Sequence, residues 1–106
     1  MSTIKNAAVL LGLVSSLSLA ADVSPERQRE LVHLVRQDCG SCHGMTLQGG
    51  LGPALTPQAL EGKPAESLVA TIMGGRPGTP MPPWHRFLSE AEATWVVEKL
   101  MAGFPQ

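Results

Sequence analysis

The sequence predicts an all-α protein with one small domain. Three segments place apolar residues at the i, i+3, i+4 spacing of an amphipathic helix, and each begins at a residue suited to a helix N-terminus. The sequence has no convincing alternation of apolar and polar residues over the length of a strand, and no repeat or linker. We therefore expect three main helices joined by loops rich in glycine and proline.

The first twenty residues have the pattern of a secretory signal peptide. Lys5 supplies one positive charge, residues 7–14 form an apolar run, and Ser18 and Ala20 have the small-residue spacing of a cleavage site. The apolar run is too short to cross a hydrocarbon core of about 30 Å. We expect cleavage after Ala20, which leaves residues 21–106 as a single periplasmic domain without a membrane span.

The first helix is predicted to run from Pro25 to about Asp38. Ser24 can accept a hydrogen bond from the first turn as its N-cap, and proline is favoured at the first helical position. The apolar face of this helix consists of Leu31, Leu34 and Val35.

Both cysteines of the chain lie in the stretch CGSCH, residues 39–43. An exported chain meets an oxidising compartment, so a disulfide between Cys39 and Cys42 is one alternative, but it gives His43 no role. A thioredoxin-like redox site would need a βαβ pattern, which this sequence does not provide. A closed zinc site would need four ligands at a spacing that the remaining histidines do not supply.

C-x-x-C-H is the attachment sequence of c-type haem. Cys39 and Cys42 would bond to the two vinyl groups of the porphyrin as thioethers, and His43 would be the proximal ligand of the iron. Because the motif uses every cysteine of a small exported chain, we predict one covalently bound haem c. The haem would also fill the centre of a domain that has no Tyr, two Phe and two Trp.

A long loop, LQGGLGPALTPQALEGK, separates the motif from the second predicted helix. That helix opens at Pro64 with the stretch PAESLVATIM and ends at the pair Gly74 and Gly75, since glycine commonly follows the last turn of a helix.

Met81 is the predicted second axial ligand of the iron. It lies in GGRPGTPMPPWH, residues 74–85, where four prolines exclude a regular helix and stiffen the loop. A rigid loop can hold a thioether against iron without relying on helix packing. His/Met ligation is typical of electron carriers, whereas an open second position is typical of haem proteins that bind or activate ligands.

The other candidates for this position are Met45, Met73, Met101, His33 and His85. Met45 follows His43 too closely to reach the opposite face of the ring. Met73 and Met101 fall on predicted helices at apolar spacing, where methionine usually fills a core. His85 is the alternative ligand, but it follows the proline cluster toward the next helix.

The third helix begins with a capping box formed by Ser89 and Glu92. Its apolar residues follow the i, i+3, i+4 pattern and are Ala93, Val96, Val97, Leu100, Met101 and Phe104.

Charge excludes one class of partner. The chain has eight Lys and Arg against nine Asp and Glu, and one of the basic residues lies in the signal peptide. Since no basic excess remains, we expect no binding to nucleic acid.

The combination of motifs resembles the class I monohaem cytochromes c over nearly the whole mature chain. It consists of CGSCH, then Gly52 and Pro53, then PGTPM ending at Met81, then a terminal amphipathic helix. The resemblance implies a cytochrome c fold around one haem. It also implies that the Pro53 carbonyl accepts a hydrogen bond from the ligating imidazole and that Thr79 lies beside a haem propionate.

The sequence departs from this family at the helix crossing. The first and last helices of the family usually cross through a glycine and an aromatic residue, but Leu31 and Val35 occupy the corresponding places on the first helix. Lys99 stands where an aromatic is expected before Leu100, and Trp95, one turn earlier, can supply the missing bulk.

The loop TPMPPW and the short length further resemble the small periplasmic cytochromes c-55X of denitrifying bacteria. This resemblance implies a one-electron carrier, not an enzyme, that donates electrons to a respiratory enzyme such as the dihaem cytochrome cd-type nitrite reductase. The alternatives are a maturation factor for that haem enzyme and a ligand-binding haem protein with an open iron. Carriers of this kind are usually monomers, with a helix-exchanged dimer as the alternative.

Overall fold

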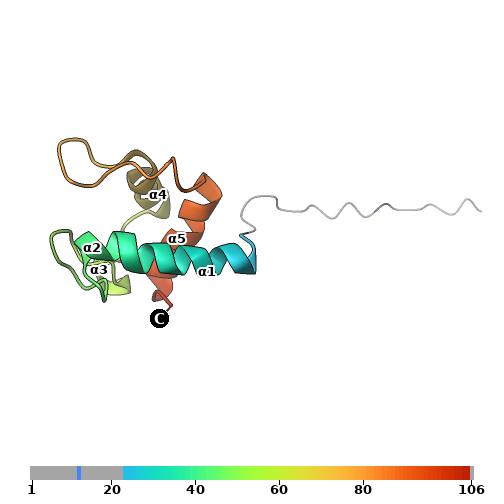
Figure 1. Cartoon of the computed structure of the whole chain (residues 1–106), viewed down its shortest axis with the longest axis horizontal. Coiled ribbons are helices and arrows are strands. Elements are labelled where there is room, and N and C mark those ends of the chain that lie inside the picture. The colour runs from blue at the N-terminus through green and yellow to red at the C-terminus, as the bar shows by residue number, and fades with distance from the viewer. Residues whose placement is uncertain (1–11, 13–22, 106) are drawn as a thin grey trace, which may run out of the picture.

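The computed structural model describes Gly12 and residues 23–105. The predicted signal peptide, apart from Gly12, and its cleavage site after Ala20 lie outside the described residues. The helices are α1 (Pro25–Leu34), the π-helical turn η1 (Val35–Cys39), α2 (Gly40–His43), α3 (Pro57–Leu60), α4 (Ala65–Gly74) and α5 (Glu90–Ala102). The described residues contain helices and loops but no strand, so the all-α prediction is confirmed (Figure 1).

The first three elements form one continuous helical run. Ser24 caps it, because its hydroxyl accepts a hydrogen bond of 3.1 Å from the backbone N–H of Arg27. The run was predicted to stop near Asp38, but it continues through the CGSCH motif by way of η1, where the N–H of Gly40 bonds to the carbonyl of Val35. Single π-helical turns of this kind occur often near functional sites. Here the turn places the motif at the end of a rigid helix.

The core lies where this first run meets α5. The largest fully buried side chains are Leu31 and Val35 on the first run and Val96 and Val97 on α5. Leu31 and Val35, which stand where the family pattern has a glycine and an aromatic residue, are therefore core residues here. Trp95 packs against the core while half-buried, and the Lys99 ammonium lies 5.5 Å from the centre of its ring.

Two arginines tie the first run to both ends of α5. Near the start of α5, the Arg27 guanidinium donates to the Glu92 carboxylate at 2.7 Å and to the Phe87 carbonyl at 3.1 Å. Past its end, Arg36 donates to the Pro105 carbonyl at 2.6 Å and lies 5.4 Å from the centre of the Phe104 ring. The orientation of the first run relative to α5 is therefore fixed at both ends.

The short helix α3 was not predicted. It begins with Thr56 as N-cap, whose hydroxyl accepts from the N–H of Ala59 at 3.2 Å, and with Pro57 in its first turn. The sequence does contain a signal for this helix, because Thr56 followed by Pro57 is a typical helix start. Both α3 and α4 pack against α5, which makes α5 the element shared by all parts of the fold.

In the part of the chain that the structure describes, no helix combines the length and the apolar character that crossing a membrane requires.

We expect the Arg27–Glu92 pair to contribute to stability in a pH-dependent way. Its hydrogen bond to Arg27 holds the pKa of Glu92 below the ordinary value of 4.5. The folded state therefore keeps the carboxylate ionised while the unfolded state takes up a proton. The contribution is present above the ordinary pKa of glutamate and is lost as the pH falls through the lowered pKa.

A double-mutant cycle with Arg27→Met and Glu92→Gln measures this contribution as the coupling in the free energy of unfolding. The side chains are 31% and 21% exposed, so we expect roughly 1 kcal/mol at pH 7 and a much smaller value near pH 3. Glu98→Gln, at an exposed position of α5, is the control. A coupling that is the same at both pH values would contradict the prediction.

Candidate functional site

The CGSCH motif occupies the last turns of the first helical run. Cys39 ends η1, and Cys42 and His43 belong to α2. Because the two cysteines are three residues apart in a helical segment, their side chains share one face. Both are free thiols and half-buried, and Cys39 packs against the hydrophobic core.

Burial makes Cys39 an unusually weak acid. Desolvation, with smaller contributions from the charges of Asp38 and Cys42, raises its pKa to about 11. The thiol is therefore neutral at pH 7, and its apolar surroundings suit an uncharged thioether. Among the described residues, no cluster of three or more His, Cys, Asp and Glu could hold a metal ion by itself, so the structure does not assemble the zinc alternative.

A single hydrogen bond fixes the imidazole of His43. Its Nδ1 lies 2.7 Å from the carbonyl oxygen of Pro53. Since a carbonyl can only accept, Nδ1 carries the proton and Nε2 keeps its lone pair for a metal. Such a bond also orients the ring and raises its basicity as a ligand.

The loop that supplies Pro53 folds back onto the end of α2. The N–H of Gly49 donates to the His43 carbonyl at 2.8 Å, and the N–H of Gly52 donates to the Cys42 carbonyl at 2.7 Å. These bonds satisfy carbonyls that the helix end would otherwise leave unpaired. A Cβ on Gly52 would lie 2.9 Å from both Nδ1 and Cε1 of His43, so glycine is required for the loop to approach the ring.

Met81 lies on the loop between α4 and α5, half-buried. In Figure 1 this loop arches over the side of the molecule where α2 lies. The Met81 carbonyl accepts from the N–H of Arg76 at 3.1 Å, and the Met81 N–H donates to the Thr79 hydroxyl at 3.3 Å. That hydroxyl donates to the Arg76 carbonyl at 2.7 Å, so its one proton is engaged within the loop.

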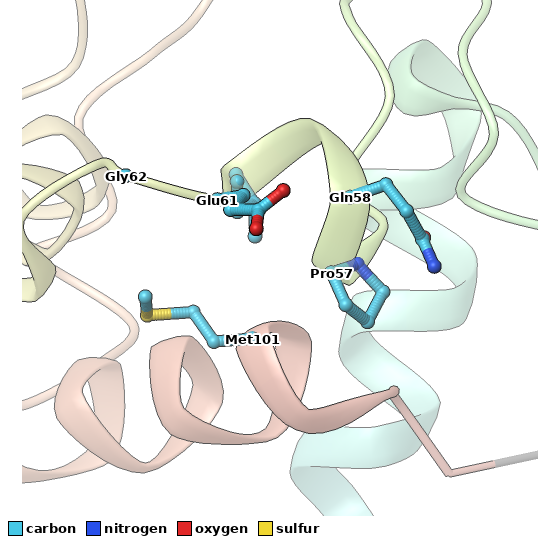
Figure 2. A pocket seen from close by; sticks show the side chains of 6 residues that line it. Pro57, Gln58, Glu61, Gly62 and Met101 are labelled. Carbon is cyan, nitrogen blue, oxygen red and sulfur yellow. The ribbon is translucent and has the colours of Figure 1, made fainter.

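The other candidate ligands lie in different surroundings. Met45 is 62% exposed, and Met73 is half-buried on α4. Figure 2 shows Met101 beside a shallow hollow of about 400 Å³ between α3 and α5, which is also lined by Pro57 and Glu61. The remaining two candidates are exposed histidines, His33 on α1 and His85, which follows the prolines in the loop between α4 and α5.

Helix α4 leaves its apolar side chains partly exposed. Although α4 is rich in apolar residues, none of them is buried. The half-buried apolar side chains of α4 are Leu68, Val69, Ile72 and Met73. Half-exposed apolar side chains, two half-buried thiols and an imidazole Nε2 that is free to bind a metal are the groups that a covalently attached haem requires.

The chain matches known proteins over most of its length. A family model described as "Cytochrome C oxidase, cbb3-type, subunit III" matches residues 26–98. Cytochrome c55X of Pseudomonas aeruginosa is 58% identical over 91% of this chain and 82% of that protein. Cytochrome c55X of Paracoccus denitrificans is 47% identical over 89% and 91% of the two chains. The chain is a c-type cytochrome.

The chain also resembles solved structures of proteins with a c-type cytochrome fold. The cytochrome resembles the "c-type cytochrome NirC" with a TM-score of 0.76 and 62% identity, over 76% of this chain and 95% of that one. It also resembles the "Dihydro-heme d1 dehydrogenase NirN in complex with DHE" with a TM-score of 0.62 and 35% identity, over 70% of this chain but 16% of that protein. The cytochrome thus has the class I cytochrome c fold and carries covalently bound haem c. As a member of this family it is an electron-transfer protein and not an enzyme.

We expect Gly52→Ala to destabilise the cytochrome through steric crowding. The added Cβ would force the ring of His43 or the loop to move, at a cost of roughly 1–3 kcal/mol in the free energy of unfolding. Gly74→Ala is the matched control, because a Cβ there meets nothing within 4 Å and alanine is favoured in a helix. Denaturant unfolding of the haem-loaded proteins measures both, and equal stabilities would contradict the expectation.

Proposed function

We propose that this cytochrome is a periplasmic one-electron carrier with a single haem c. Cys39 and Cys42 attach the haem, and His43 and Met81 are the axial ligands. The observation that carries the proposal is the 2.7 Å bond between His43 Nδ1 and the Pro53 carbonyl. It leaves Nε2 free to bind a metal, on the residue that directly follows the attachment cysteine Cys42.

The bound haem supplies one reversible redox couple, Fe(III)/Fe(II). The protein's part is to keep both ligands in place in both oxidation states. Pro53 holds the imidazole, and the bonded loop of Arg76, Thr79 and Met81 holds the thioether. His/Met ligation and apolar surroundings both raise the reduction potential.

Met81 is favoured over His85 by the way the loop is anchored. The N–H of Trp84 donates to the Ile72 carbonyl at 2.9 Å, and the Trp84 side chain packs against the core. His85 lies beyond this anchor and is exposed. Met81 lies within the loop that is anchored at Arg76 and at Trp84, whereas the exposed His85 lies outside it, which favours Met81 as the ligand.

The proposed partner is a respiratory enzyme of denitrification, with the dihaem cytochrome cd-type nitrite reductase as electron acceptor. The similarity to cytochromes c55X over nearly the whole chain supports this proposal. The domain would comprise residues 21–106 after removal of residues 1–20, and it would act as a monomer, with a helix-exchanged dimer as the alternative.

A maturation role is the second candidate. The dihydro-heme d1 dehydrogenase of Pseudomonas aeruginosa is 36% identical to 92% of this chain, a match that spans 20% of that protein. A similar unit therefore occurs as a segment of an enzyme whose name refers to haem d1. Deleting the cytochrome separates the two roles. Loss of the carrier leaves nitrite reductase fully active with an artificial electron donor, whereas loss of a maturation factor leaves that enzyme deficient in its cofactor.

We expect the oxidised cytochrome to show the weak near-infrared absorption band of sulfur-ligated iron. Met81→Ala should abolish this band and open the reduced iron to rapid CO binding. Met45→Ala, at an exposed position, should leave both properties as in the wild type. The band should also persist in His85→Ala. A wild type without the band, in which His85→Ala and not Met81→Ala opens the reduced iron to CO, would show that His85 is the ligand.

Arg76 and Arg86 should steer an acidic partner toward this side of the molecule. Both are exposed, and the segment between them contains no acidic residue. The double alanine variant should react more slowly with nitrite reductase at low ionic strength, and the difference should shrink with added salt. Arg29→Ala, an exposed position on α1, is the control. Wild-type rates that do not depend on salt would contradict the idea.

A further inference from the structure

The loop that carries Met81 is closed by backbone contacts of its own. Gly75 follows α4 with a φ of 69°, and its N–H donates to the Thr71 carbonyl at 2.8 Å. The next residue, Arg76, donates its N–H to the Met81 carbonyl at 3.1 Å. The chain therefore turns back within a few residues and returns to the end of α4.

Gly75 lies directly against the returning segment. A Cβ at this position would lie 2.7 Å from the carbonyl carbon of Pro82, 2.7 Å from the nitrogen of Pro83 and 2.8 Å from the carbonyl oxygen of Met81. All three are backbone atoms, which cannot move aside as the end of a flexible side chain can. Only glycine fits between the end of α4 and the segment that carries Met81.

Thr79 links the two sides of the same turn. Its hydroxyl donates to the Arg76 carbonyl at 2.7 Å and accepts from the N–H of Met81 at 3.3 Å. Since Arg76 also bonds to the Met81 carbonyl, both backbone polar groups of Met81 are held from within the loop.

We propose that Gly75 is a positioning residue for Met81, and that its close packing against residues 81–83, completed by the Thr79 hydroxyl, fixes the thioether relative to α4. This inference rests on the proposed role of Met81 as an axial ligand. A backbone held in this way needs no rearrangement when the iron changes oxidation state. It also opposes the displacement of Met81 by an external ligand.

The test compares Gly75→Ala with Gly78→Ala in the haem-loaded protein. The control is close, because Gly78 lies in the same loop with a φ of 82°, but a Cβ there meets nothing within 4 Å. Both positions have a positive φ, so both variants carry backbone strain, but only Gly75→Ala also crowds the Met81 segment. The readouts are the rate of CO binding to the reduced protein, the near-infrared band of the oxidised protein and the reduction potential.

We expect Gly75→Ala to bind CO roughly tenfold faster than the wild type, with a weaker near-infrared band and a lower potential. Gly78→Ala should stay within about twofold of the wild-type rate. Equal behaviour of the two variants, with the wild-type band intact, would overturn the role of Gly75. A wild type that lacks the band and binds CO rapidly would overturn the ligation by Met81 as well.

A second pair of variants decides the matter if Gly75→Ala does not yield folded protein. Thr79→Ser keeps the hydroxyl that bonds to Arg76 and Met81, whereas Thr79→Val removes it at nearly constant size. We expect faster CO binding and a weaker band in Thr79→Val but not in Thr79→Ser. If the two variants behave alike, the proposed positioning of Met81 by this loop is wrong.

Discussion

The hydrogen bond from His43 Nδ1 to the Pro53 carbonyl is the interaction on which the site depends. It joins the end of the first helical run to the loop that follows, and it decides which ring nitrogen is free. The loop can make this bond because Gly52 approaches the ring without a side chain and because its N–H caps the Cys42 carbonyl. The same few residues thus end the helix and fix the imidazole.

The two proposed axial ligands come from separate parts of the chain, and α5 sets their relative position. His43 ends the first helical run, which Arg27 and Arg36 tie to residues at the two ends of α5. Met81 follows α4, which packs against α5. The apolar face of α4 remains half-exposed in the polypeptide alone, so a bound haem would complete the core. An electron carrier benefits from this arrangement, since a ligand set fixed by the fold needs little reorganisation.

The sequence predicted those features of the fold that depend on neighbouring residues. The cap at Ser24 and the capping box at Ser89 each depend on residues within a few positions, and both are present as predicted. The π-helical turn, which begins at the buried Val35, has no local signal in the sequence and was missed. The Arg27–Glu92 pair was missed because it joins residues 65 positions apart.

The close approach of Gly75 to residues 81–83 could not be predicted from the sequence, because the pair Gly74 and Gly75 indicated only the end of a helix. The contact of Thr79 with a haem propionate stays a prediction; in the polypeptide its hydroxyl bonds within the loop. The short helix α3 had a signal, because Thr56 and Pro57 form a typical helix start.

Methyl NMR of the reduced cytochrome tests the central claim most directly. With the methionine methyl groups isotopically labelled, a thioether bound to the iron lies over the porphyrin ring, whose ring current shifts its methyl signal far upfield. The account predicts one such signal in the wild type, its loss in Met81→Leu, and ordinary positions for the methyl groups of Met45, Met73 and Met101. An upfield signal that survives in Met81→Leu, or a wild type without one, would contradict ligation by Met81.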